Sequence, residues 1–215
     1  MHLKRQQVPK NWPIFRKGTK YVVRPNSDGG KGIPILIVLR DMLKVAQNKK
    51  EAKRIIHLRE VLVNNKFVSD EKKNILLFDT ITLQVIKKHY RMELSNYGKF
   101  YLTEIKDNEA NHKIVKLADK KVLKGKKIQL NLEDGRNFIS NIKCSVNDSL
   151  LVNFKEKKVE KCIPLKDGSG VFVFSGKHSG KLGIVKKIYK EKGVAEIDID
   201  EKPISVLIKQ FIVIK

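Results

Sequence analysis

An excess of positive charge is the feature that most limits how this chain can fold. Its 215 residues include 46 Lys or Arg but only 23 Asp or Glu, which gives a formal net charge of +23. Charge of one sign opposes compaction through self-repulsion, whereas nucleic acid phosphates turn it into binding energy as counterions are released. We therefore expect a polyanionic partner, and nucleic acid is the leading candidate.

The apolar residues predict several small cores rather than one large core. They make up 41% of the chain, which is too much for a disordered basic tail. No apolar run reaches the roughly 18 residues of a membrane-spanning helix, and the first residues lack a signal-peptide pattern, so we expect a cytoplasmic protein with no membrane partner. Cys144 and Cys162 lack the spacing of a zinc site. We expect them to be small buried hydrophobic residues, with no metal and no other cofactor.

Residues 1–33 predict a basic N-terminal arm. Three prolines interrupt any helix, and Trp12, Phe15 and Tyr21 are the only large apolar anchors. Such a segment is expected to be extended and to become ordered on RNA. Trp12 could either stack on a base or pack against the next domain. The expected RNA-binding residues of the arm are Lys4, Arg5, Lys10, Trp12, Arg16, Lys17, Lys20, Arg24 and Lys31.

Residues 34–74 predict two helices followed by a short hairpin. Apolar residues recur with helical spacing from Pro34 to Ala46, and Arg40 and Lys44 fall on the opposite face, where we expect them to bind RNA. A second helix follows, with favourable capping residues at its start. An Asn-Asn pair then separates two short strand-like runs, as in a hairpin turn.

The second helix carries a stripe of basic residues. Lys50, Lys53, Arg54 and His57 occupy i, i+3, i+4 and i+7, which places them on one face. Charge runs usually form a solvated face, but few acidic residues offset this one, so we interpret it as an RNA contact. The segment from Lys50 to Val68 resembles the helix-helix-hairpin RNA-binding domain of bacterial small-subunit ribosomal protein four, which also occurs in RNA-modifying enzymes.

Residues 75–166 predict a central β-rich, barrel-like domain. Short alternating runs are separated by turns such as Glu133–Arg136. We expect Arg136, at that turn, to bind RNA. The basic run Asp119–Lys127 indicates a surface loop that faces either phosphate or water.

Residues 167–215 predict a small C-terminal barrel. The order of Gly176, Gly180 and Gly183 before an apolar run resembles the KOW motif, an SH3-like β-barrel element of ribosomal proteins and transcription elongation factors. A phosphate-binding P-loop is excluded, because the glycine spacing is one residue short and Leu182 stands where Ser or Thr is needed. The glycines either approach RNA or only shape a turn. The expected RNA-binding residues here are Gly176, Lys177, His178, Lys181 and Lys186.

The order of these four modules resembles small-subunit ribosomal protein four of the archaeal and eukaryotic type, the S4e family. The resemblance covers essentially the whole chain and rests on weak motifs in the right order: His2–Arg5, Pro9–Trp12, Asp134–Asn137, Val146–Ser149 and Gly176–Ile188. It implies an α+β, multi-module fold and a structural role in the 30S subunit, with 16S rRNA and neighbouring ribosomal proteins as partners. The chain ends without the long basic tail of eukaryotic members, which favours an archaeal source.

Two other classes of protein stay open. An RNA-modifying enzyme could carry the same two-helix module, but the five histidines are scattered, and Asp79 lacks the Gly- and Arg-containing setting of a pseudouridine synthase. The other class is an accessory RNA-binding protein or a KOW-containing regulatory factor. We expect no enzyme activity and no small-molecule substrate. Because Lys far outnumbers Arg, most contacts should be made to phosphate and should position the RNA without reading its sequence.

Overall fold

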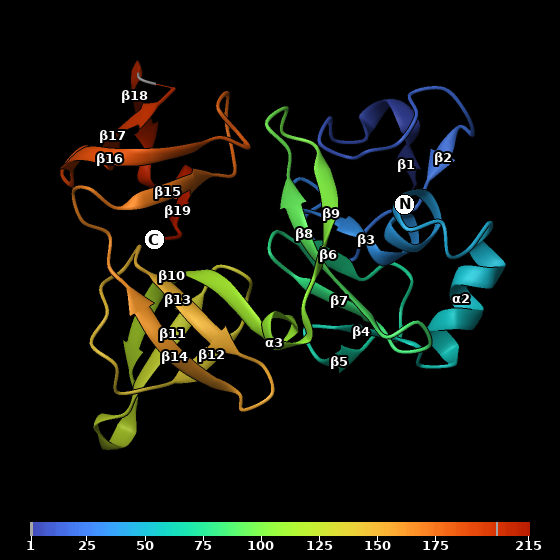
Figure 1. Cartoon of the computed structure of the whole chain (residues 1–215), viewed down its shortest axis with the longest axis horizontal. Coiled ribbons are helices and arrows are strands. Elements are labelled where there is room, and N and C mark those ends of the chain that lie inside the picture. The colour runs from blue at the N-terminus through green and yellow to red at the C-terminus, as the bar shows by residue number, and fades with distance from the viewer. Residues whose placement is uncertain (1, 201) are drawn as a thin grey trace. The chain divides into compact units, whose positions relative to one another are not determined.

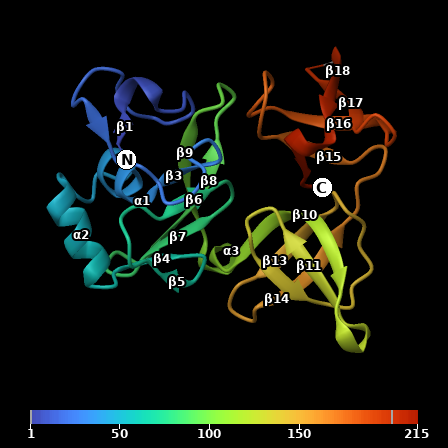
Figure 2. The same cartoon turned by 180° about the vertical axis from the view of Figure 1, so that it is seen from behind.

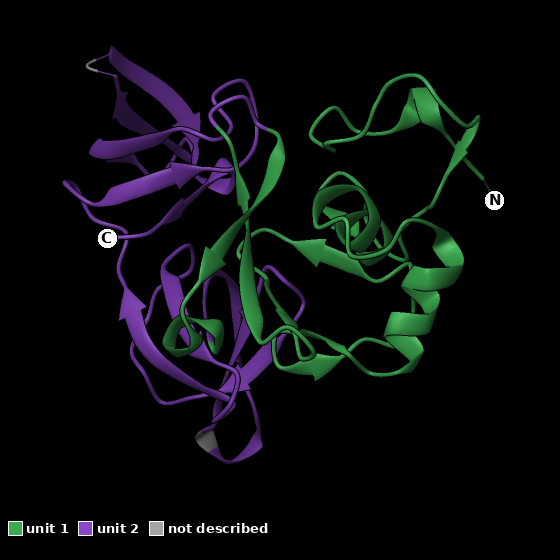
Figure 3. Cartoon of the chain, turned by 45° about the vertical axis from the view of Figure 1, so that its right-hand side comes forward, with its two compact units in different colours: residues 1–95, 99–111 green, residues 96–98, 112–215 purple. Residues whose placement is uncertain are grey.

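The structure is a computed structural model that describes residues 2–200 and 202–215, and all of their side chains except that of Lys126. It is rich in β-strands and divides into two compact units. Unit 1 comprises residues 1–95 and 99–111, and unit 2 comprises residues 96–98 and 112–215 (Figure 3). No helix among the described residues is long and apolar enough to cross a membrane.

The basic N-terminal segment is part of unit 1 and packs against its other residues. Three short elements turn it back on itself, with the first strand paired to the second: β1 (Leu3–Lys4), η1 (Arg5–Gln7) and β2 (Tyr21–Val22). Trp12 is 3% exposed, and its indole nitrogen donates hydrogen bonds to the carbonyl oxygens of Gly29 and Gly32. The packing alternative for Trp12 is therefore confirmed. An extended arm was expected, whereas in this structure the segment is folded back, and this one side chain buries a large apolar surface and also finds two hydrogen-bond acceptors.

The two expected helices are present, but the first is short and irregular. α1 (Ile35–Ile37) continues directly into a π-helical turn, η2 (Val38–Met42), and its own residues are fully buried. α2 (Lys49–His57) begins with the expected capping box. The Asn48 side chain accepts a hydrogen bond from the Glu51 amide at 3.0 Å, and the Glu51 carboxylate accepts hydrogen bonds from the Asn48 side-chain amide at 2.6 Å and from the Gln47 backbone at 2.7 Å.

An antiparallel five-stranded sheet in the order β5-β4-β7-β8-β9 follows the helices (Figure 1). Its strands are β4 (Val61–Val63), β5 (Lys66–Phe67), β7 (Thr80–Leu83), β8 (Lys88–Leu94) and β9 (Phe100–Ile105). The remaining elements of unit 1 are the pair β3 (Gly32–Pro34) and β6 (Asn74–Leu76), and the helix α3 (Asp107–Ala110). Because β4 pairs with β7, the predicted domain boundary after residue 74 lies inside one sheet. The two compact units instead divide after residue 111, apart from residues 96–98, which belong to unit 2.

Two buried polar side chains, Asn64 and Asp79, connect the β4–β5 hairpin to the chain between β6 and β7. Asp79 is 4% exposed, and its carboxylate accepts hydrogen bonds from the Asn64 amide at 2.6 Å and from the Leu76 backbone at 2.7 Å. The Asn64 oxygen in turn accepts from the Thr80 backbone at 3.0 Å. Asn64 has a φ of 49°, as the Asn-Asn turn signal predicts. These contacts give Asp79 a role in holding the hairpin.

Unit 2 contains two five-stranded antiparallel sheets (Figures 1 and 2). The central sheet, in the order β12-β11-β10-β13-β14, is built from β10 (His112–Val122), β11 (Ile128–Leu132), β12 (Asn137–Ile139), β13 (Ser149–Asn153) and β14 (Lys158–Ile163). The C-terminal sheet, in the order β18-β17-β16-β15-β19, is built from β15 (Gly170–Val173), β16 (Leu182–Tyr189), β17 (Val194–Ile199), β18 (Lys202–Leu207) and β19 (Phe211–Val213). Two short 3-10 turns complete the unit: η3 (Lys124–Lys126) and η4 (Ile208–Gln210). Each sheet has its own apolar core.

A buried lysine joins the two sheets of unit 2. Lys116, on β10, is 5% exposed, and its ammonium group donates hydrogen bonds to the carbonyl oxygens of Ile208 and Phe211. Burial lowers the pKa of Lys116 to about 8, against the opposing effect of the Glu133 carboxylate. Because the acceptors belong to η4 and β19, the central and C-terminal sheets share polar contacts.

The Val146–Ser149 motif strengthens the same connection. The Asp148 carboxylate, which is almost fully buried, accepts hydrogen bonds from the Ser145 backbone at 2.6 Å and from the Leu165 backbone at 2.9 Å. The Ser149 hydroxyl accepts one from the Val213 backbone on β19 at 2.9 Å. The motif thus ties β13 to the segment that leads into the C-terminal sheet and to its last strand.

Candidate RNA interface

The N-terminal segment presents a uniformly basic surface on unit 1. No Asp or Glu precedes Asp28 in the sequence. Seven of the nine residues expected to bind RNA there are exposed: Lys4, Lys10, Arg16, Lys17, Lys20, Arg24 and Lys31. Their charges can therefore reach phosphate groups.

Arg5 and Trp12 are the two exceptions, because both face the protein itself. The Arg5 guanidinium donates to the carbonyl oxygens of Phe15 and Thr19, each at 2.7 Å, and to the Thr19 hydroxyl at 2.9 Å. Gly18 passes beside it, so that a Cβ there would lie 3.1 Å from the guanidinium carbon. Arg5 therefore organises the loop 13–20, whereas the sequence-based prediction gave it a contact with RNA. Trp12, which was also predicted to bind RNA, is buried against the protein in this structure.

The basic stripe of α2 is only partly free of acidic partners. Lys50, Arg54 and His57 are exposed. Lys53 instead forms an ion pair with Glu71 at 3.2 Å, beside a second pair between Lys49 and the same carboxylate at 3.0 Å. Burial acts to raise the pKa of Glu71, but the hydrogen bonds and charges of the two lysines outweigh it and lower that pKa. Glu71 lies outside the helix, so the sequence pattern of the stripe did not include it.

Two other predicted contacts also have acidic neighbours. The Arg40 guanidinium lies 2.8 Å from the Asp41 carboxylate. Arg136 stacks on the Phe154 ring, with 4.3 Å between the guanidinium carbon and the ring centroid, and lies 3.7 Å from Asp134. Both side chains are half-buried, so less of their charge is available to RNA than for an exposed residue. Lys44, in contrast, is exposed.

The glycines of the KOW-like stretch have structural reasons to be glycine. Gly176 has a φ of 90°, a left-handed conformation that L side chains rarely adopt. A Cβ at Gly183 would meet the carbonyl oxygen of Asp198 at 2.6 Å. Turn shape and close strand packing therefore account for both positions.

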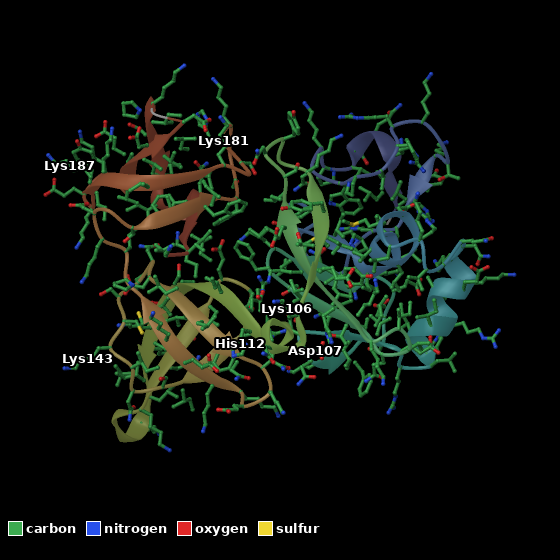
Figure 4. All side chains as sticks on the ribbon, in the orientation of Figure 1. Lys106, Asp107, His112, Lys143, Lys181 and Lys187 are labelled. Atoms are coloured by element: carbon green, nitrogen blue, oxygen red, sulfur yellow. The ribbon has the colours of Figure 1, made fainter. Side chains whose placement is uncertain are left out.

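The basic residues beside those glycines are spread over β16 and the loop before it. Lys181 forms an ion pair with Asp200 at 2.7 Å, and its hydrogen bond lowers the pKa of that carboxyl. Lys186 pairs with Asp198 at 3.0 Å. Figure 4 shows Lys187 on β16 and Lys181 in the loop before that strand. The other two predicted residues are exposed Lys177 and half-buried His178.

The structure adds one basic surface that the site prediction did not include. Strand β10 extends to Val122 and pairs with β11, so the run Asp119–Lys127 forms the end of a hairpin rather than an irregular loop. Its lysines with described side chains are mostly exposed: Lys120, Lys121, Lys124 and Lys127.

Metal ligands and reactive thiols are the other chemical groups that a functional site could use. Among the described residues, no three His, Cys, Asp or Glu side chains gather where they could hold a metal ion. Both cysteines are free thiols, and burial, with the neighbouring Cys144 and Asp148, raises the pKa of Cys162 to about 12. A thiol with so high a pKa is a poor nucleophile near neutral pH.

Replacing Lys50 and Arg54 together by Ala should weaken RNA binding without unfolding the protein. Each lost phosphate contact should make the slope of log K against log salt shallower by about 0.7 to 0.9. Thermal unfolding and salt-dependent RNA binding would be measured side by side. Lys53→Ala is the matched control, because its ion pair with Glu71 should make it change the slope less. RNA binding that is unchanged by the double substitution would make the stripe an ordinary solvated face.

Comparison with known proteins places the chain in a family. Residues 1–27 match the model of the RS4NT (NUC023) domain, and residues 86–159 match the model of ribosomal family S4e. The chain is 41% identical over 190 residues to the small ribosomal subunit protein eS4 of Methanocella arvoryzae, which covers 87% of this chain and 80% of that protein. It is 35% identical over 188 residues to the protein of the same name from Archaeoglobus fulgidus, covering 86% and 79%.

A solved structure supports the same assignment. The crystal structure of the 30S ribosomal protein S4e from Thermoplasma acidophilum matches with a TM-score of 0.72 at 27% identity, over 86% of this chain and 95% of that chain. The sequence and the fold therefore agree across most of both chains. The chain belongs to the ribosomal S4e family.

Proposed function

We propose that this protein is a structural constituent of the small ribosomal subunit in the cytoplasm, where it binds 16S rRNA and contacts neighbouring ribosomal proteins. The observation that carries the proposal is the 41% identity, over 190 residues, to an archaeal protein named as a small ribosomal subunit protein. The exposed cations of the N-terminal segment and α2 support it, because they supply the charge that phosphate binding needs.

In our proposal, each of the two units binds RNA through its own surfaces. The N-terminal segment and α2 with the β4–β5 hairpin bind RNA in unit 1. The central sheet and the C-terminal sheet, which we interpret as an SH3-like KOW barrel, bind it in unit 2. The lysine-rich hairpin of β10 and β11 supports a contact by the central sheet. Since most of these groups are lysines, they position RNA without selecting its sequence.

Binding rather than catalysis is the proposed role throughout. Asp79 is the carboxylate that the sequence analysis considered as a catalytic candidate. It is buried and accepts hydrogen bonds from Asn64 and Leu76. These bonds explain its presence in terms of the fold.

Cosedimentation tests the proposed function. A tagged full-length chain expressed in an archaeal host should migrate with 30S particles on a density gradient at physiological salt, and raising the salt far above that should release it, because its contacts to phosphate are electrostatic. The tag alone, fused to an unrelated protein, is the control. A chain that migrates free, with a polymerase, or with tRNA would instead favour a regulatory factor or an accessory RNA-binding protein.

A further inference from the structure

We propose that Phe15 stacks on an unpaired nucleobase of the RNA, and that Arg5 is the positioning residue that holds Phe15 ready for this contact. The inference rests on the proposed function, since it assigns a base contact within the RNA-binding N-terminal segment. It differs from the sequence-based expectation, in which Trp12 was the candidate for stacking and Phe15 was an apolar anchor.

The first observation is that Phe15 is exposed although its backbone is fixed. Its side chain is 88% exposed, while its carbonyl oxygen accepts a hydrogen bond from the Arg5 guanidinium at 2.7 Å. The same guanidinium binds Thr19 through both the carbonyl and the hydroxyl oxygen. The Arg5 guanidinium thus closes the loop. Because the loop is already ordered, it loses less conformational entropy when Phe15 binds a partner.

The base of the loop is anchored as well. Trp12 is buried, and the Ile14 backbone donates a hydrogen bond to the Trp12 carbonyl oxygen at 2.9 Å. Gly18 has a φ of 139° and lies against the Arg5 side chain. The turn therefore favours a glycine at this position. The loop therefore has contacts on both sides of Phe15 that set its path.

The surroundings of Phe15 identify the partner as RNA. Arg16 and Lys17 follow it directly and are exposed, and no acidic residue occurs among the first 27. An exposed aromatic ring flanked by cations matches a nucleotide, whose base offers a π-face and whose phosphate offers negative charge. An apolar protein partner would gain nothing from the flanking charges. A single-stranded or bulged base is required, because bases within a helix are already stacked.

Tyr21 is a weaker candidate because its ring already has neighbours. The His2 ring lies 5.1 Å from the Tyr21 ring, between centroids, and the Lys20 ammonium lies 5.5 Å from its centroid. Tyr21 is also about half as exposed as Phe15. Within the described part of the segment, Phe15 is the aromatic side chain most open to a base.

Binding of the full chain to archaeal 16S rRNA transcribed in vitro tests the proposal. Phe15→Ala should bind roughly 5- to 150-fold more weakly, which corresponds to the loss of one stacked base. The slope of log K against log salt should not change, because the substitution removes no charge. Tyr97→Ala is the matched control, since Tyr97 is 92% exposed and lies outside the basic segment, and it should bind like the wild type.

Fluorescence distinguishes stacking from a general apolar contact. Phe15→Trp should keep the affinity, and its added emission should be quenched when 16S rRNA binds. Trp12 is the natural chain's single tryptophan, so the wild type supplies the background signal. Affinity of Phe15→Ala within twofold of the wild type, or a Phe15→Trp variant that binds without quenching, would overturn the base contact. If the wild type itself did not bind 16S rRNA, both the proposed function and this inference would fail.

A double-mutant cycle tests the role of Arg5. Arg5→Met should lose affinity and also reduce the quenching seen with Phe15→Trp, because the loop is no longer closed. Combining Arg5→Met with Phe15→Ala should weaken binding little beyond the stronger single effect. Additive losses, with a salt slope shallower by about one unit in Arg5→Met, would instead make Arg5 an independent phosphate contact and overturn its positioning role.

Discussion

Binding of this chain to 16S rRNA should weaken steeply as salt rises. If about eight of the 46 basic groups neutralise phosphates, the slope of log K against log salt should be about −6 to −7. Raising monovalent salt from about 50 to about 200 mM would then lower the affinity by about 10⁴-fold. Filter binding with full-length 16S rRNA across a salt series measures this slope directly.

The structure indicates which groups could supply so many contacts. Nine of the predicted cations that are exposed on unit 1 lie in the N-terminal segment and on α2: Lys4, Lys10, Arg16, Lys17, Lys20, Arg24, Lys31, Lys50 and Arg54. Lys181 and Lys186 provide the matched comparison, since both already pair with aspartates. Their replacement by Ala should alter the slope less than replacement of Arg16 and Lys17. A wild-type slope near −1 would show that the charge faces solvent in the complex and would contradict RNA binding through these surfaces.

Features of the fold that depend on neighbouring residues could be predicted from the sequence. The capping pair Asn48 and Glu51 marks the start of α2, and Asn64 turns the hairpin with the positive φ that its side chain tolerates. The glycine spacing led correctly to strands rather than to a P-loop helix after Gly183. Each of these signals acts within a few residues, so its outcome does not depend on the rest of the chain.

Features that depend on distant partners could not be predicted in the same way. The boundary placed after residue 74 falls between β4 and β7, which pair in one sheet, and Asp79 stabilises that arrangement. Charge counting along 1–33 predicted an extended arm, but it gave no weight to the acceptors that Gly29 and Gly32 offer to one indole. The contacts of this single buried side chain fold the segment back, although its average composition predicted an extended arm.

The same limit applies to the candidate interface. The sequence can mark a basic residue as a candidate RNA contact, but it does not show whether the side chain already binds another group of the protein. Lys53 and Arg5 both do so. Lys53 pairs with Glu71, which is 18 residues away, and Arg5 binds carbonyl oxygens up to 14 residues away. Exposed lysines such as Lys10 and Lys50 keep their assignment because accessibility is the property that phosphate binding requires.

Trp12→Ala should destabilise unit 1 by about 3 to 5 kcal/mol, the usual loss for removing a buried aromatic side chain. The ring is 3% exposed, and its removal also leaves the carbonyl oxygens of Gly29 and Gly32 without their donor. Denaturant unfolding of the full chain, followed by circular dichroism, measures the change. Phe15→Ala is the matched control from the same segment, and because its side chain is exposed it should shift stability by less than about 0.5 kcal/mol.

Trp12→Ala should loosen the N-terminal segment more than the rest of unit 1, because Trp12 is the main apolar side chain that attaches the segment. Once released, the segment carries seven positive and no negative charges through residue 27, so repulsion and chain entropy should keep it open. Limited trypsin digestion of the free protein should therefore cut Trp12→Ala faster than wild type after Lys10, Arg16 and Lys20. In intact small subunits the wild-type sites should be protected, since phosphates would neutralise the same charges. Equal cutting of the free wild type and the free variant would mean that Trp12 does not hold the segment, and that its order comes from RNA alone.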